Sequence, residues 1–230
     1  MSSKNCGGRT RALVKPKAFI FDLDGVLTDT AELHYLGWKR LADELGIGFN
    51  RNDNEALRGI SRRASLLLLL KGCAQEYTDA QLDEFMERKN SYYRQYIESI
   101  TPADLLPGSL ELLERLKQQG YQLALGSASK NAPAVIKKLG LASYFSVVAD
   151  PGSVKNAKPA PDLFLLAARE LGVEPSSCVV VEDASAGVEA ALEAGMWVIG
   201  IGPASRVGAA DYVYDSLVGI NPERLFQEVK

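Results

Sequence analysis

The chain has 230 residues, is 47% hydrophobic and 24% charged, and carries a formal net charge of −3. Its length allows one large domain or one domain with an insert, and its composition provides enough apolar side chains for a buried core. The negative net charge argues against nucleic acid as a partner, because contacts with a phosphate backbone need a basic face. No apolar run approaches the ~18 residues of a membrane span.

The N-terminal segment, residues 1–16, contains basic side chains but lacks the apolar stretch of a signal peptide. We expect a flexible, solvated tail there. Three cysteines without the spacing of a metal site predict a reducing compartment, and we therefore expect the protein to be cytoplasmic.

Helical patterning alone covers the chain from about residue 32 to residue 99. Glu32–Leu45 has the apolar spacing of a helix. Thr78–Gln81 has the pattern of a capping box, which predicts that another helix begins there. The apolar run Leu66–Leu70 is expected to be helix core that faces other helices, because it is too short for a membrane span.

Short apolar runs alternate with helical stretches after Pro107, and one such run precedes the helical segment. The predicted strands are Ala18–Phe21, Tyr121–Leu125, Phe145–Ala149, Cys178–Val181, Trp197–Ile201 and Tyr212–Tyr214. The predicted helices are Leu110–Gln119, Ala132–Leu139, Pro161–Leu171 and Ala186–Ala194, each followed by a glycine. This alternation predicts an α/β fold with a doubly wound parallel sheet, covered by helices on both faces.

The helical segment lies in the sequence between the first and the second predicted strand. It is therefore expected to be an all-α insert into the α/β core. We expect residues 17–30 and 106–230 to form the core and residues 31–105 to form the insert. The two connections, Thr28–Thr30 and Pro102–Pro107, are the expected hinge.

Polar residues that directly follow the predicted strands are candidate site residues, because ligands of open α/β sheets bind at the carboxyl ends of the strands. They are Asp22, Asp24, Ser127, Ser129, Lys130, Asn131, Lys158, Glu182 and Asp183. A lone aspartate after a strand is usually a turn or cap residue. The convergence of so many polar residues at one edge favours a site.

Phosphoryl transfer with a hard cation is the chemistry that suits this set. Neighbouring carboxylates would repel one another, and Mg²⁺ would neutralise them. The predicted metal ligands are Asp22, Asp24, Glu182 and Asp183. Lys158 and Ser127 would face the phosphoryl oxygens, where charge develops in the transition state. The chain contains no Walker A pattern, no complete dinucleotide fingerprint and a single histidine, His34.

Four ordered motifs resemble those of the haloacid dehalogenase-like phosphotransferases. Asp22–Thr28 matches the DxDGx[T/V] nucleophile motif, and Ser127, Lys158 and Glu182–Asp183 match the other three in order and spacing. The resemblance covers the chain from about residue 18 to the C-terminus, and it implies a Rossmann-like core with a cap. It also implies that Asp22 is the nucleophile, which forms an aspartyl-phosphate, and that Asp24 is the general acid/base.

Within this superfamily the chain resembles the β-phosphoglucomutases. The resemblance rests on residues 22–32, His34, Trp38, Leu57–Arg62, Arg88–Asn90, Ser127–Asn131 and Lys158–Asp162. Two positions depart from the expected pattern. Arg58 stands where the family is expected to have lysine, and Arg63 stands where an acidic residue is common. Both departures keep or add positive charge.

The resemblance implies that the helical insert closes over the site and that a bisphosphate is held at two places. Arg62, with its planar fork, would hold the distal phosphate together with Ser129, Lys130 and Asn131. Trp38 and Lys89–Asn90 would line the sugar space. The helical spacing of Thr30, His34 and Trp38 puts all three on one helix face, which is expected to point at Asp24.

The predicted site consists of two sets of residues. The predicted catalytic residues are Asp22, Asp24, Ser127, Lys158 and His34. The predicted substrate-binding residues are Asp22, Leu23, Asp24, Trp38, Gly59, Ile60, Ser61, Arg62, Lys89, Asn90, Ser127, Ala128, Ser129, Lys130, Asn131 and Lys158.

The sequence therefore predicts a Mg²⁺-dependent enzyme that interconverts β-glucose 1-phosphate and glucose 6-phosphate through an aspartyl-phosphate and β-glucose 1,6-bisphosphate. A sugar-phosphate phosphatase of the same fold is the alternative; Arg62 and the loop Ser127–Asn131 favour the mutase. A non-enzymatic sugar-phosphate-binding module is disfavoured, because it has no need of the paired aspartates Asp22 and Asp24. We expect a monomer whose partners are small sugar phosphates, with no nucleic acid or membrane partner.

Overall fold

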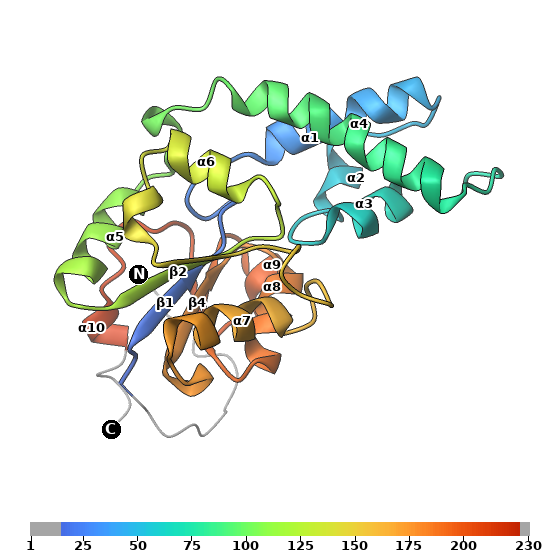
Figure 1. The fold of residues 1–230 in the computed structure, drawn as a ribbon. Coiled ribbons are helices and arrows are strands. Elements are labelled where there is room, and N and C mark those ends of the chain that lie inside the picture. The colour runs from blue at the N-terminus through green and yellow to red at the C-terminus, as the bar shows by residue number, and fades with distance from the viewer. Residues whose placement is uncertain (1–14, 226–230) are drawn as a thin grey trace.

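The computed structural model describes residues 15–225. The tail predicted for residues 1–16 therefore lies outside the described residues, except for its last two. Within the described range, six parallel strands form one sheet in the order β3-β2-β1-β4-β5-β6 (Figure 1). The strands are β1 (Ala18–Phe21), β2 (Gln122–Gly126), β3 (Val147–Ala149), β4 (Cys178–Glu182), β5 (Trp197–Ile201) and β6 (Tyr212–Tyr214). The predicted doubly wound parallel sheet is confirmed.

The strand order reverses between β1 and β4, so the first strand of the chain lies in the middle of the sheet. β1 pairs with β2 on one side and with β4 on the other, which places Phe21 opposite Leu125 and Val181. The segments that follow β1, β2 and β4 therefore meet at one edge. This edge is a topological switch point, where open α/β sheets bind their ligands.

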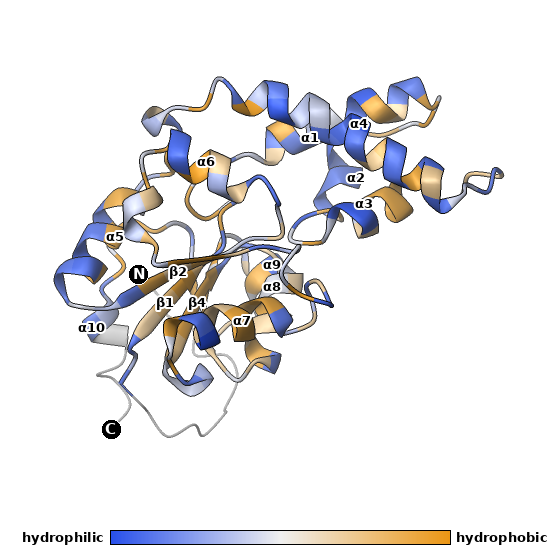
Figure 2. Ribbon diagram, in the orientation of Figure 1, coloured by the Kyte–Doolittle hydropathy of each residue, from blue (hydrophilic) through white to orange (hydrophobic). Residues whose placement is uncertain are grey.

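Alternate residues of β1 face two separate hydrophobic cores. Phe19 and Phe21 pack in a core that includes side chains of α5 (Ser109–Gln118) and α6 (Ala132–Lys138). Ala18 and Ile20 pack in a core with α7 (Asp162–Leu171) and α8 (Ser185–Glu193). Because both faces are covered, the strands are mostly apolar, as Figure 2 shows for β1, β2 and β4.

Four helices inserted between β1 and β2 form a separate layer, which we call the cap. They are α1 (Ala31–Glu44), α2 (Arg51–Glu55), α3 (Arg62–Leu69) and α4 (Asp79–Ile97). Trp38, Leu41, Leu66 and Phe85 are buried in a third core inside the cap. Figure 1 shows the cap beyond the end of the sheet toward which the strands run.

Local signals explain where the cap helices begin. The predicted capping box is confirmed at α4, since Thr78 Oγ1 accepts from the amide of Gln81 and Gln81 Oε1 accepts from the amide of Thr78.

The prediction for Leu66–Leu70 is wrong in part: Leu66 is buried, but Leu67 and Leu68 are 49% and 43% exposed. A helix of this period turns two of five successive residues away from its buried face.

Two antiparallel connections join the cap to the core. Thr28 forms an isolated antiparallel bridge with Leu105. The amide of Leu106 donates to the carbonyl of Leu27 at 2.9 Å, and the hydroxyl of Thr28 donates to the carbonyl of Asp104 at 2.8 Å. The segments predicted as the hinge therefore lie side by side.

Shorter helices complete the described chain. They are η1 (Pro102–Asp104), η2 (Ala142–Tyr144), η3 (Pro175–Ser177), α9 (Ala204–Val207) and α10 (Pro222–Leu225). Between residues 15 and 225 no helix combines the length and the apolar character that crossing a membrane requires.

Replacement of Leu113 tests the packing of α5 against the sheet. Leu113 is fully buried, so Leu113→Ala is expected to lower the free energy of unfolding by about 2–5 kcal/mol, measured by urea denaturation. Leu110 lies on the same helix but is 42% exposed, and Leu110→Ala is expected to change that free energy by no more than about 0.5 kcal/mol. Equal losses in the two variants would contradict this packing.

Candidate active site

A buried lysine holds together the ends of three strands. Lys158 Nζ donates to Asp22 Oδ1 at 2.7 Å, to Glu182 Oε2 at 2.9 Å and to the carbonyl of Gly126 at 3.1 Å. Asp22 follows β1, Gly126 ends β2 and Glu182 ends β4. Burial alone would lower the pKa of Lys158, but the charges of Asp22 and Glu182 outweigh it and raise this pKa above its ordinary value.

Three carboxylates gather around this lysine. Asp22, Glu182 and Asp183 are buried, and each offers an oxygen within 4.8 Å of those of the other two. Burial and then the charge of Asp22 raise the pKa values of both Glu182 and Asp183. Hard oxygen donors such as these are the ligands of Mg²⁺ and Ca²⁺. The cluster therefore fits a divalent cation. Asp24, predicted as a fourth ligand, is not part of it.

Asp24 instead contacts the first helix of the cap. The hydroxyl of Thr30 donates to Asp24 Oδ1, and His34 Nε2 lies 3.9 Å from Asp24 Oδ2. Burial, followed by the charges of Asp22 and Asp183, raises the pKa of Asp24 to about 8. Near neutral pH, a carboxyl group with this pKa is able both to release and to accept a proton.

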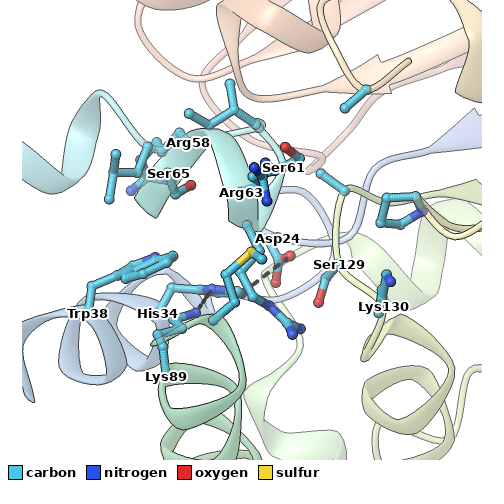
Figure 3. A pocket seen from close by; sticks show the side chains of 18 of the residues that line it. Asp24, His34, Trp38, Arg58, Ser61, Arg63, Ser65, Lys89, Ser129 and Lys130 are labelled. Carbon is cyan, nitrogen blue, oxygen red and sulfur yellow. Dashed lines mark hydrogen bonds and ion pairs between the residues drawn. The ribbon is translucent and has the colours of Figure 1, made fainter. Parts of the chain in front are cut away.

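His34 and the buried Lys89 form a pair beside Asp24 (Figure 3). Lys89 Nζ lies 2.9 Å from His34 Nδ1, and it lies 4.9 and 4.8 Å from the ring centroids of Trp38 and Tyr93. Burial, and then the charge of Arg62, lowers the pKa of Lys89 to about 7.

His34 has a pKa well below its ordinary value, chiefly because it is buried and secondly because of Lys89. A neutral His34 that accepts from Lys89 at Nδ1 carries its proton on Nε2, the nitrogen nearer Asp24. Thr30 and His34 thus reach Asp24 directly, whereas Trp38, from the same helix face, packs on Lys89.

A second polar cluster joins the cap to the loop after β2. Asn90 Oδ1 accepts from Arg62 Nη2 at 2.8 Å and from Asn131 Nδ2 at 2.9 Å. Ser129 Oγ accepts from the amide of Asn131, and Ser127 Oγ accepts from the amide of Ser129. Burial lowers the pKa of Arg62. An arginine fork held in this way at a cap–core contact is suited to bind phosphate.

A cavity of about 570 Å³ lies between the cap and the core (Figure 3). The predicted site residues that line it are Asp22, Asp24, His34, Trp38, Gly59, Ile60, Ser61, Arg62, Lys89, Ala128, Ser129, Lys130 and Asp183. Those that do not are Leu23, Asn90, Ser127, Asn131, Lys158 and Glu182. Lys158 and Glu182 lie next to Asp22 inside the core, and Leu23 is buried in the core that α5 and α6 cover.

Two glycines allow close approaches at the site. A Cβ on Gly25, whose φ is +84°, would lie 2.3 Å from Asp183 Oδ2. A Cβ on Gly59 of the cap, whose φ is +71°, would lie 2.7 Å from the Cβ of Ala184 in the core. These positions require glycine both for backbone conformation and for space.

Several cavity residues lie outside the predicted site set, although the family resemblance already drew on Ala31, Leu57 and Arg58 and noted Arg63. They are Ala31, Asn54, Leu57, Arg58, Arg63, Ser65, Asp83, Met86, Glu87, Pro151, Val154, Lys155 and Ala157. Helical spacing signals two of them, because Ser65 lies three residues after Arg62 and Met86 three residues before Lys89. The loop residues follow β3, so the rule that ligands bind at strand ends also points to them.

Comparisons with known proteins agree with this geometry. The model of the haloacid dehalogenase-like hydrolase family matches residues 16–195. The chain is 44% identical to the β-phosphoglucomutase of Bacillus subtilis, over 92% of this chain and 95% of that protein. It is 31% identical to a phosphorylated carbohydrates phosphatase of Thermotoga maritima, over 93% and 98%. The crystal structure of a β-phosphoglucomutase from Clostridium difficile has a TM-score of 0.88 at 42% identity, covering 91% of this chain and 95% of that one.

The buried ammonium of Lys89 is expected to cost stability at low pH. Its pKa is about 7 in the folded chain against 10.5 in the unfolded chain. Below pH 7 the folded protein must bury a charge, so Lys89→Met is expected to raise the free energy of unfolding at pH 6 by more than about 1 kcal/mol.

Between pH 7 and pH 10.5 the unfolded chain binds more protons than the folded one, so the wild type gains stability and this difference is expected to shrink. Urea denaturation at pH 6 and pH 9 measures it, with the exposed Lys71→Met as the control. A difference that does not change with pH would contradict the account.

Proposed function

The chain belongs to the haloacid dehalogenase-like hydrolase family, and we propose that it is a phosphotransferase that interconverts β-glucose 1-phosphate and glucose 6-phosphate through β-glucose 1,6-bisphosphate. The observation that supports a mutase most directly is the cluster of Arg62, Asn90 and Asn131, in addition to the carboxylates around Asp22. A bisphosphate that reacts at either end needs one place for the reacting phosphate and another for the distal one.

We propose that Asp22 is the nucleophile. Lys158 keeps one of its oxygens in place, and the raised pKa of Lys158 keeps that ammonium charged. An oxygen of Asp22 forms a bond to phosphorus as the bond from phosphorus to the sugar oxygen breaks, which leaves an aspartyl-phosphate. A divalent cation held by Asp22, Glu182 and Asp183, which we propose to be Mg²⁺, would stabilise the negative charge of the transferring group.

Asp24 is the proposed general acid and base. With a pKa of about 8 it donates a proton to the leaving sugar oxygen and accepts one from the hydroxyl group that attacks the aspartyl-phosphate. Thr30, which directly precedes α1, fixes the orientation of its carboxyl group, and His34 of the cap lies beside it, so His34 positions Asp24 only while the cap lies against the core.

Cap closure is the proposed means of excluding water. We propose that residues 31–105 move as a unit against residues 17–30 and 106–230, about the paired connections at Thr28 and Leu105. In the closed form Gly59 abuts Ala184 and Asn90 contacts Asn131 across the cavity. Water that reached the aspartyl-phosphate would hydrolyse it, so a mutase needs this closure more than a phosphatase does.

The remaining features of the proposal concern partners and location. The substrates are small sugar phosphates, in keeping with a cavity of about 570 Å³. The net charge of −3 argues against a nucleic-acid partner, and the three cysteines support a reducing, cytoplasmic location for the proposed monomer.

A coupled assay tests the proposed reaction. Purified protein with Mg²⁺, β-glucose 1-phosphate and a trace of glucose bisphosphate is expected to form glucose 6-phosphate at least about tenfold faster than free phosphate, because the closed cavity excludes water. Both products are measured in parallel. Release of free phosphate at the rate of substrate loss would contradict the mutase and establish the phosphatase.

Neighbouring arginines of α3 test the distal phosphate site. Arg62→Ala is expected to lower kcat/KM for β-glucose 1-phosphate by about 10²-fold and to increase the fraction of phosphate released to water, since a charge-assisted contact is lost. Arg62→Lys is expected to restore only part of this loss. The ammonium group keeps the positive charge but lacks the planar fork of arginine.

Arg63→Ala is the matched control. Arg63 lines the cavity but pairs with Asp79 on the surface of the cap at 2.6 Å, so its replacement is expected to change kcat/KM less than threefold, roughly the limit for an exposed ion pair. Equal losses from Arg62→Ala and Arg63→Ala would contradict the assigned phosphate site.

A further inference from the structure

Two guanidinium groups approach the carboxylate of Asp183, one from the cap and one from the core. Arg58 Nη1, from the cap, lies 3.1 Å from Asp183 Oδ2. Arg206, in α9 of the core, places Nη2 at 3.6 Å from the same oxygen and donates from Nε to the backbone carbonyl of Asp183 at 2.7 Å. Arg206 therefore holds both the main chain and the side chain of one member of the carboxylate cluster.

Glu55 of the cap joins the same two arginines. Arg58 Nε lies 3.1 Å from Glu55 Oε2, and Arg206 Nη1 lies 3.5 Å from that oxygen. Glu55, Arg58, Asp183 and Arg206 thus form a closed ring of alternating charges, which we call the latch. Two members belong to the cap and two to the core, so the ring exists only when the cap lies against the core.

The core half of the latch does not depend on the cap for its position. The bond from Arg206 to the carbonyl of Asp183 lies entirely within the core. The guanidinium also packs against Gly202, where a Cβ would lie 2.7 Å from Arg206 Nη2. Arg206 is thereby held beside Asp183 whether or not Glu55 is present, and Glu55 and Arg58 meet it when the cap closes.

The latch explains why arginine suits position 58. The planar fork of Arg58 contacts Glu55 through Nε and Asp183 through Nη1 at the same time. A lysine offers one compact ammonium group, which does not span two acids in this way. The replacement of the expected lysine by arginine thus extends a contact with Asp183 into a ring that reaches Arg206.

We propose that Arg206 is a positioning residue with two effects: it orients Asp183 for the divalent cation, and through Glu55 it stabilises the closed cap. The second effect rests on the cap motion in the proposed function. Neither effect requires Arg206 to touch the substrate. Asp183 belongs both to the latch and to the carboxylate cluster that fits a cation, so the latch links cap closure to that cluster.

Glu55→Gln and Glu32→Gln are a matched pair of variants. Glu55 is 52% exposed and pairs across the interface with Arg206; Glu32 is 49% exposed and pairs with Arg51 inside the cap. Each variant removes one negative charge from one half-exposed ion pair, so neither is expected to prevent folding. Only Glu55→Gln breaks the latch.

Two measurements without any substrate test the proposal, so their outcome is separate from that of the sugar-phosphate assay. Acrylamide quenching of Trp38, which lines the cavity, reports cap opening when Trp197 is replaced by Phe in every variant. Glu55→Gln and Arg206→Gln are expected to raise the quenching constant about twofold, and Glu32→Gln to leave it unchanged. Titration with Mn²⁺ alone measures the affinity of the carboxylate cluster for a divalent cation.

Arg206→Gln is expected to weaken Mn²⁺ binding at least about threefold, because the hydrogen bond that orients Asp183 through its backbone carbonyl is lost. Glu55→Gln is expected to leave Mn²⁺ affinity within about twofold, since Arg206 stays on Asp183. Equal quenching in Glu55→Gln and Glu32→Gln would overturn the latch. Unchanged or stronger Mn²⁺ affinity in Arg206→Gln would overturn the orientation of Asp183 by Arg206.

Discussion

The buried ammonium group of Lys158 is the contact on which the rest of the site depends. It satisfies its three donors at Asp22, Glu182 and Gly126, and so fixes the ends of β1, β4 and β2 relative to one another. Removing either partner from a buried ion pair leaves an uncompensated charge, which costs about 3–5 kcal/mol. The sheet order makes this contact possible, because β1 lies between β2 and β4 at the switch point. The core therefore holds three carboxylates in fixed positions, where their oxygens fit a divalent cation.

The cap supplies what the core lacks. His34 of α1 reaches Asp24, Asn90 of α4 links Arg62 to Asn131, and Arg58 reaches Asp183. Each of these contacts crosses from the cap or completes a cluster at its border with the core. In the proposed function, closing the cap would set the acid/base group, form the distal phosphate site and shield the cavity in one movement. A buried titratable group such as Lys89, with a strongly shifted pKa and a place in the cavity wall, is typical of functional sites.

Sequence reasoning predicted the core well and the cap contacts less well, for a physical reason. Apolar runs that end in polar residues predict both a buried parallel strand and the place where it ends, so Asp22, Glu182 and Asp183 were found from local pattern. The resemblance to a known family added roles for Arg62 and Lys89. Contacts that depend on how the cap docks leave no local signal: the partners of Arg206 lie 23 and 151 residues away along the chain. Leu67 and Leu68 show the same limit within the cap, since an unbroken apolar run does not reveal which side of a short helix faces solvent.

The central claim is that Asp22 carries the phosphoryl group, and trapping that group tests it most directly. The protein is mixed briefly with glucose 1,6-bisphosphate, quenched in acid and treated with borohydride, which reduces an aspartyl-phosphate to homoserine. Peptide mass spectrometry then locates the modified residue. The account predicts homoserine at position 22 and an unmodified carboxylate at Asp24, Glu182 and Asp183. Homoserine at any of those three positions, or unmodified Asp22 in a protein that turns over the bisphosphate, would contradict it.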